Sequence, residues 1–169
     1  TVVGQNGTSA ATTGAFSVEA IADAEVDVTA SLAGPENNVT SGLSLTDVLA
    51  GLKLYLGKSL PESYSSPYNY IAADFDADND VDLSDVLNML KYYLGKSTTN
   101  NVEPEWAFVD KADFTDDMVD TIAGADGNPL SKLNTTPHTI DQDISVDGTI
   151  ELVGVLRGDV DGSWVPVTE

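Results

Sequence analysis

The run Asp74-Phe-Asp-Ala-Asp-Asn-Asp-Val-Asp-Leu-Ser-Asp85 carries an acidic side chain at places one, three, five, seven, nine and twelve of a twelve-residue stretch. The apolar residues after it recur at helical spacing, which predicts a loop that leads into a helix. Six like charges in so short a stretch repel strongly unless a cation neutralises them. Alternate oxygens in such a loop match the roughly six to eight ligands that hard Ca²⁺ prefers. The sequence therefore predicts a calcium loop.

Each acid of this loop has an expected role. The first three acids are expected to provide side-chain oxygens, Asp80 its backbone carbonyl, and Asp82 a direct or water-mediated contact. Asp85 is expected to close the site from the first turn of the next helix, where Glu is usual, and Asn79 stands where Gly usually makes the turn. Asn tolerates the left-handed backbone that this turn needs. The alternative is a solvated acidic turn. The predicted ligands are Asp74, Asp76, Asp78, Asp80, Asp82 and Asp85.

The segment around this helix occurs twice. Residues 44–59 align with residues 82–97 at an offset of 38, and eleven of the sixteen places are identical, which indicates an internal duplication. Each copy predicts a helix that ends at a glycine, Gly57 or Gly95, followed by a lysine that suits the negative helix end. We expect the two apolar stripes to face each other. The stripes consist of Leu45, Val48, Leu49, Leu52 and Leu56, and of Leu83, Val86, Leu87, Leu90 and Leu94.

Residues 36 to 97 resemble the dockerin type I module, a pair of loop-helix calcium motifs that attaches enzymes to scaffolds bearing cohesin domains. The second half carries the resemblance through its loop spacing, its closing Asp85 and its Val-Leu-x-x-Leu-Lys-Tyr-Tyr-Leu-Gly ending. The first half is degraded, because only two carboxylates remain there, on Glu36 and Asp47. Whether that half binds calcium stays open. Counted back from Asp47, its loop places fall on Glu36, Asn38, Thr40, Gly42 and Ser44.

The resemblance also implies a partner surface. In dockerins, the helix face that matches Lys53 and Lys91 contacts the cohesin. The alternative is two exposed lysines whose stems lie on apolar surface. Dockerins that recognise a partner usually carry a paired Ser/Thr signature, whereas Thr46 and Ser84 give one hydroxyl each here. The expected partners are therefore calcium, with a cohesin-like domain or neighbouring domains of the parent protein as further candidates.

A third acidic cluster lies at residues 157–164, Arg-Gly-Asp-Val-Asp-Gly-Ser-Trp. Its acids and Ser163 stand at the first, third and fifth places of a calcium loop, but no twelfth place follows. One interpretation is that this half-loop packs against the degraded first motif and completes its site with Asp47. The other is an Asp-Gly turn at the end of a strand, with Trp164 covering the sheet edge. The candidate residues of this second site are Asn38, Thr40, Asp47, Asp159 and Asp161.

Outside residues 36–100 the pattern changes to alternating apolar and β-branched runs separated by polar turns, which predicts strands. We expect an α+β chain in which residues 1–35 and 101–169 form an antiparallel β-sandwich, with the helical pair of residues 36–100 inserted between its strands. Residues 12–18 and 26–30 resemble the carboxypeptidase-regulatory, prealbumin-like type of sandwich. Two independent domains in series are the alternative. The predicted strands are residues 1–4, 14–21, 25–32, 105–109, 139–146 and 149–156.

Composition narrows the classes of function. The chain has 28 acidic and 7 basic residues, a net charge of −21 and no cysteine. A field of this sign repels nucleic acids and anionic membranes, and no apolar run approaches the length of a membrane span. We expect a secreted or cell-surface bacterial protein that uses calcium rather than disulfides for rigidity.

Catalysis finds little support in the residue types. Nucleophilic chemistry or a zinc site would have to depend on the single histidine, His138. We therefore expect a calcium-binding structural or interaction module that is not an enzyme. The alternative is a carbohydrate-binding appendage of an extracellular enzyme with an aromatic platform. The candidate platform residues are Trp106, Trp164, Tyr64, Tyr68 and Tyr70.

Overall fold

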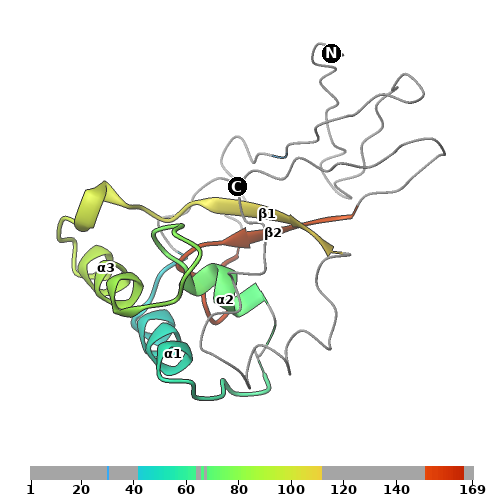
Figure 1. The fold of residues 1–169 in the computed structure, drawn as a ribbon, viewed down its shortest axis with the longest axis horizontal. Helices are drawn as coiled ribbons and strands as arrows, with labels where there is room; N and C mark the ends of the chain where they lie inside the picture. The colour runs from blue at the N-terminus through green and yellow to red at the C-terminus, as the bar shows by residue number, and fades with distance from the viewer. Residues whose placement is uncertain (1–29, 31–41, 64–65, 67, 112–150, 166–169) are drawn as a thin grey trace, which may run out of the picture.

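The computed structural model describes residue 30 and residues 42–63, 66, 68–111 and 151–165, which form a mixed α+β arrangement (Figure 1). Helix α1 (Leu45–Tyr55) packs against α3 (Leu83–Tyr93) and α2 (Tyr68–Ala73), and α2 packs against strand β2 (Leu152–Leu156). Within this part of the chain, no helix has the length and apolar character that crossing a membrane requires. The elements are α1 (Leu45–Tyr55), α2 (Tyr68–Ala73), α3 (Leu83–Tyr93), a short 3₁₀ helix (Thr99–Asn101), β1 (Trp106–Asp110) and β2 (Leu152–Leu156).

The two repeated helices begin in the same way. Ser44 caps α1, because its hydroxyl accepts a hydrogen bond from the backbone N–H of Thr46 at 3.2 Å. Asp47 reaches back and accepts from the Ser44 N–H at 2.8 Å, which completes a capping box. In α3, Asp82 is the cap and Asp85 accepts from its N–H at 2.8 Å. The first turn of each helix therefore holds an acid whose carboxylate points back toward the preceding loop.

The two helices also end in the same way. Gly57 and Gly95 have φ values of 62° and 63°, in the left-handed region that glycine tolerates. The N–H of Lys58 donates to the carbonyl of Lys53 at 2.8 Å, and Lys96 donates to Lys91 at the same distance. These are Schellman-type ends. The predicted glycine caps are confirmed.

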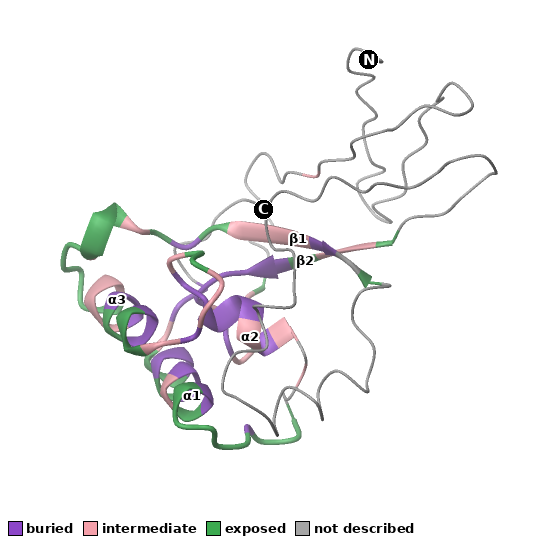
Figure 2. Ribbon diagram, viewed as in Figure 1, coloured by how far each residue is buried: buried purple, intermediate pink, exposed green. Residues whose placement is uncertain are grey.

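The core lies between α1, α3 and the sheet, and only part of each predicted apolar stripe belongs to it. The buried side of α1 carries Val48, Ala50 and Gly51, and Met89 of α3 packs against Gly51, where an added Cβ would lie 3.4 Å from its sulfur. The prediction that the stripes face each other is therefore correct only in part. Val48 and Val86 are buried in the shared core, and Leu52 and Leu90 pack against it. The other leucines are turned outward, because small residues permit close approach of the helices (Figure 2). Each of the following leucines is 46–56% exposed: Leu45, Leu49, Leu56, Leu83, Leu87 and Leu94.

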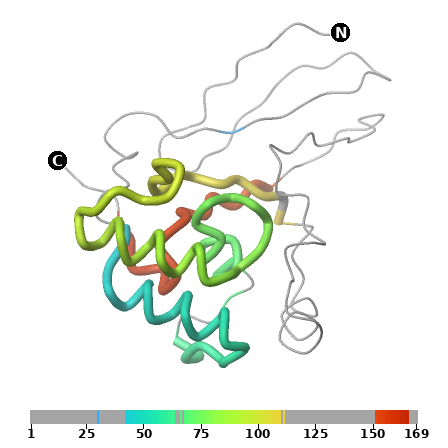
Figure 3. Tube along the Cα trace, turned by 60° about the vertical axis from the view of Figure 1, so that its left-hand side comes forward, coloured from blue at the N-terminus to red at the C-terminus, as the bar shows by residue number. Residues whose placement is uncertain are grey.

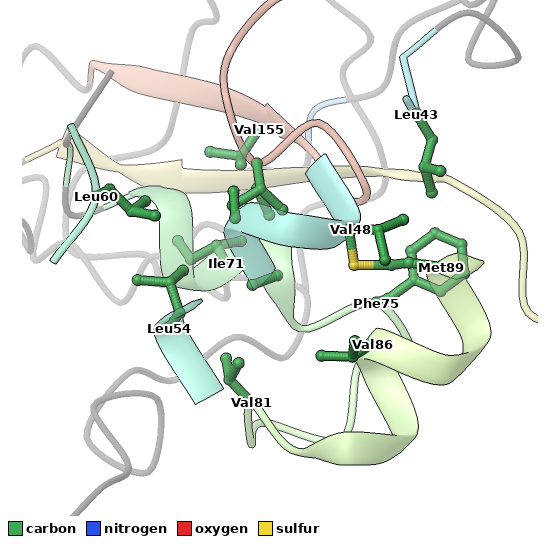
Figure 4. Packing of buried hydrophobic residues seen from close by; sticks show 14 of the residues in the cluster. Leu43, Val48, Leu54, Leu60, Ile71, Phe75, Val81, Val86, Met89 and Val155 are labelled. Atoms are coloured by element: carbon green, nitrogen blue, oxygen red, sulfur yellow. The ribbon is translucent and has the colours of Figure 1, made fainter. Parts of the chain in front are cut away.

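Strands β1 and β2 pair antiparallel, with Trp106 opposite Leu156 and Val109 opposite Val153. Val109 and Val155 are buried in the same core cluster as the helical residues, so the helices and the sheet share one core (Figure 4). The two described strands confirm the strands predicted near residues 105–109 and 149–156. The other predicted strands lie outside the described residues, and the β-sandwich stays a prediction.

Candidate metal centres

The twelve-residue loop brings three carboxylates together before α3. Asp74, Asp76 and Asp78 each offer an oxygen, and these oxygens lie within 4.8 Å of one another. Asp74 is fully buried, and its Oδ1 accepts a hydrogen bond from the N–H of Asp78 at 3.1 Å. Its Oδ2, the Oδ1 of Asp76 and the Oδ1 of Asn79 are buried without a hydrogen-bond partner. Buried oxygens left in this state are costly, and a cation would satisfy them.

The backbone of this loop turns twice through the left-handed region. Asn79 has φ of 70°, which confirms the role predicted for it in place of glycine. Ala77 has φ of 62°, a conformation that costs a residue with a Cβ about 1 kcal/mol or more. Side chains brace the turn, since Asp78 Oδ1 accepts from the N–H of Asp80 at 3.0 Å and Asp80 Oδ1 accepts from Val81 at 2.8 Å. The loop is therefore shaped by its own acids.

Asp85 lies beneath this group and is 1% exposed. Its Oδ1 accepts from the N–H groups of Phe75 at 2.7 Å and Asp76 at 3.2 Å, and its Oδ2 accepts from Asp82 at 2.8 Å. The group of three oxygens within 4.8 Å does not include Asp85, Asp80 or Asp82. Ligation by Asp85, by the backbone carbonyl of Asp80, and by Asp82 directly or through water stays a prediction. What the structure shows of Asp85 is a carboxylate that holds both ends of the loop.

Burial shapes the electrostatics of this loop. It raises the pKa of Asp74 to about 6, against the opposing effect of the Arg157 guanidinium, and the pKa of Asp85 to about 7, against its backbone hydrogen bonds. Burial, followed by the charges of Asp78 and Asp82, also raises the pKa of Asp76. Without a cation, the loop thus resists full ionisation near neutral pH.

A second group of three acids joins two distant parts of the chain. Asp47, at the start of α1, lies with Asp159 and Asp161, and their oxygens fall within 4.8 Å of one another. The N–H of Asp161 donates to Asp47 Oδ1 at 3.0 Å, across 114 positions of sequence. Burial raises the pKa of Asp159 to about 6 and also raises that of Asp47. We call this the split group, and the acids of residues 74–78 the continuous group.

The split group repeats the hydrogen bonding of the continuous loop at its closing acid. Asp47 accepts from the N–H of the helix cap and from that of Asp161, as Asp85 does from its own cap and from Asp76. Asp161 and Asp76 both occupy the third loop place. Residues 159–163 and 43–47 therefore correspond to the first and last parts of the loop at residues 74–85.

The first half of the split loop, residues 159–163, also matches the first half of the continuous loop. Asp159 Oδ1 accepts from the N–H of Ser163 at 2.8 Å, just as Asp74 accepts from the residue four places on. Gly162, at the fourth place, has φ of 66°, against 62° at Ala77. Val160, at the second place, is fully buried like its counterpart Phe75, which is 1% exposed. The half-loop thus has the conformation and the buried side of a complete one.

The segment after β2 is held against the helices by main-chain contacts. The N–H of Gly158 donates to the carbonyl of Ala72 in α2 at 2.8 Å, and the amide of Asn69 donates to the carbonyl of Val160. Gly158 has φ of 99°, and a Cβ there would lie 3.0 Å from Leu43 and 3.1 Å from Phe75. Only glycine fits this close approach. In Figure 3, the red stretch that contains β2 and this segment runs beside the helices.

The predicted second site is thus brought together in part. Asp47, Asp159 and Asp161 form one group that could hold a metal ion, whereas Asn38 and Thr40 lie outside the described residues. No spacing pattern in the sequence points to Arg157, which is buried beside the continuous group. The only sequence signal for it is an arginine directly before an acidic cluster in a chain with 7 basic residues.

Comparisons with protein-family models, curated proteins and solved structures found no match to this chain. The interpretation of the two groups therefore rests on the residues themselves.

Proposed function

We propose that this chain is a non-catalytic calcium-binding module of a secreted or cell-surface bacterial protein, in which calcium makes the fold rigid. The observation that carries the proposal is the continuous group. Three carboxylates converge there, and the buried Oδ2 of Asp74 has no hydrogen-bond partner. The split group supports it, because the same hydrogen-bond pattern is assembled from two separate segments.

The chemistry of both groups favours calcium. All six acids offer hard carboxylate oxygens, and neither group contains histidine or cysteine. Zinc and copper prefer those softer ligands. Magnesium demands near-ideal octahedral geometry, whereas calcium accepts the varied ligand directions of an acidic loop. An ion in the continuous group would be held by Asp74, Asp76 and Asp78, and one in the split group by Asp47, Asp159 and Asp161.

The exposed leucines of α1 and α3 support a docking role for the module. These leucines occupy equivalent places in the two repeats; Leu49 of α1, for example, corresponds to Leu87 of α3. Each is about half exposed. Apolar surface of this kind often marks an interaction site. A cohesin-like domain or a neighbouring domain of the parent protein is the partner that the dockerin resemblance suggests.

An aromatic cluster favours carbohydrate binding as a second candidate function. Trp106 and Trp164 meet edge to face with ring centroids 5.0 Å apart, and Trp106 and Phe108 stack at 6.5 Å. All three rings are partly exposed. Quenching of tryptophan fluorescence by soluble polysaccharides tests this candidate. An unchanged emission spectrum across a panel of plant and bacterial polysaccharides would refute it.

Calorimetric titration with calcium tests the main proposal. We expect two sites in the parent chain, loss of one in Asp76→Asn/Asp78→Asn, and loss of the other in Asp159→Asn/Asp161→Asn. Asp80→Asn is the matched control, since this loop acid lies outside the group of three and is expected to contribute its backbone carbonyl. It should retain both sites. Absence of calcium binding, with identical melting in calcium and in EDTA, would refute the proposal.

A further inference from the structure

Arg157 is the one buried basic side chain among the described residues, with 5% of its surface exposed. It follows β2 directly and precedes the half-loop of the split group. Burying a guanidinium is costly unless acids surround it. Its position beside the continuous group therefore calls for an explanation.

Two acids hold the guanidinium in place. Its Nη1 lies 2.6 Å from Glu105 Oε1, a hydrogen-bonded ion pair with an exposed partner. Its Nη2 lies 3.8 Å from Asp74 Oδ2, which is too far for a hydrogen bond. That oxygen is one of the buried atoms without a hydrogen-bond partner. Arg157 thus offsets the charge of Asp74, while the lone pairs of Asp74 Oδ2 stay free for another cation.

We propose that Arg157 is a tethered counter-cation that sets the affinity of the continuous group for its ion. This inference rests on the proposed function. With no ion bound, the guanidinium offsets part of the charge of Asp74 and stabilises the loop. With an ion bound, the same positive charge repels it and weakens binding. Even with the dielectric constant of water, a unit charge a few ångströms from a divalent ion changes its affinity by about tenfold.

In the described part of the chain, the split group has no basic residue equivalent to Arg157. Among the described residues, no lysine or arginine forms an ion pair with Asp47, Asp159 or Asp161. The two groups therefore differ in two ways. In this part of the chain, only the continuous group has a basic side chain beside it, and only the split group is built from two separate segments of the chain. Only the continuous group should respond when the charge of Arg157 is removed.

The test compares Ca²⁺ and Tb³⁺ binding to the full chain and to Arg157→Gln. Calorimetry gives both dissociation constants, and tryptophan-sensitised terbium emission gives a second measure for Tb³⁺. We expect the Ca²⁺ dissociation constant of the continuous group to fall about tenfold and that for Tb³⁺ about thirtyfold, because Coulomb repulsion scales with ion charge. Lys111→Gln is the matched control, since it removes an exposed cation paired with Glu151 and should leave both constants unchanged.

The ratio of the two constants remains informative even where Arg157→Gln unfolds without an ion. The free energy of folding enters both constants equally and cancels in their ratio. A ratio unchanged from the parent chain, or weaker Ca²⁺ binding by a folded variant, would overturn the inference. Arg157→Lys retains the charge and should keep the parent ratio. If the parent chain binds no calcium, the proposed function fails too; if it binds calcium but the ratio does not move, only the role of Arg157 fails.

Discussion

Removing calcium should invert the usual effect of acid on this protein. Burial raises the pKa of Asp85 to about 7 and that of Asp74 to about 6, from an ordinary value of 3.8. The fold therefore binds protons more tightly than the unfolded chain does. The stability from this difference is fully present below about pH 4 and is lost as pH rises through 6 and 7. In EDTA, the protein should melt at a higher temperature at pH 5 than at pH 8.

The size of this effect follows from the shifts. Both side chains are essentially buried, at 0% and 1% exposure, so solvent screens them little. At about 1.36 kcal/mol per pKa unit, ionisation costs the fold about 4 kcal/mol at Asp85 and about 3 kcal/mol at Asp74. Between pH 5 and pH 8 the two together account for a difference of about 4 kcal/mol. For a chain of this length, that corresponds to a melting temperature about 10 °C lower at pH 8.

Differential scanning calorimetry between pH 5 and pH 8, in EDTA and in millimolar calcium, measures the effect. In calcium the order should reverse, because protons then compete with the ion for the same oxygens. High salt screens the exposed charges of the chain and isolates the buried ones. Asp74→Asn is the control, since it cannot ionise and should reduce the dependence in EDTA by about a third. A melting temperature that rises with pH in EDTA would refute the reasoning.

Three further predictions concern the fold around the two groups. Gly158→Ala should lower the free energy of unfolding in urea of the calcium-bound protein by about 3 kcal/mol, because the added Cβ would lie 3.0 Å from Leu43. Gly162→Ala is the control and should cost about 1 kcal/mol, because Gly162 has φ of 66° but faces open space. Equal losses in the two variants would contradict this. Asn69→Ala removes the amide that donates to Val160 and should weaken calorimetric calcium binding in the split group while the continuous group is unchanged. Met89→Ala should cost about 2–5 kcal/mol in the same urea assay because Met89 is fully buried, and Leu87→Ala, on the exposed side of α3, should cost under about 1 kcal/mol.

Features that depend on neighbouring residues were predictable from the sequence. The loop spacing, the glycine helix ends and the left-handed Asn79 follow from local backbone rules, and the structure shows the last two directly. The half-loop of residues 159–163 could be related to Asp47 only because a repeat supplied the spacing for the missing half. That pairing is the one long-range feature of the candidate sites that the sequence indicated.

Features that depend on packing were not predictable in the same way. A leucine at helical spacing shows that a helix has an apolar side, but the small residues Ala50 and Gly51 decide which side meets α3. Helix α2 has six residues, too few to show a helical period. The role of Arg157 depends on Asp74 and Glu105, which are far from it along the chain and come near it only in the folded state.

The split loop links the order of synthesis to the order in which ions can bind. A ribosome completes residues 74–85 well before it reaches Asp159, so every acid of the continuous group is made before the split group has its full set. Closing a chain loop of more than a hundred residues costs roughly 4 kcal/mol of entropy, which an ion in the split group would offset only after residues 159–161 have been made. A chain truncated before those residues would contain all three acids of the continuous group but only Asp47 of the split group. Under the proposed function, the split group would therefore be the later of the two to bind calcium.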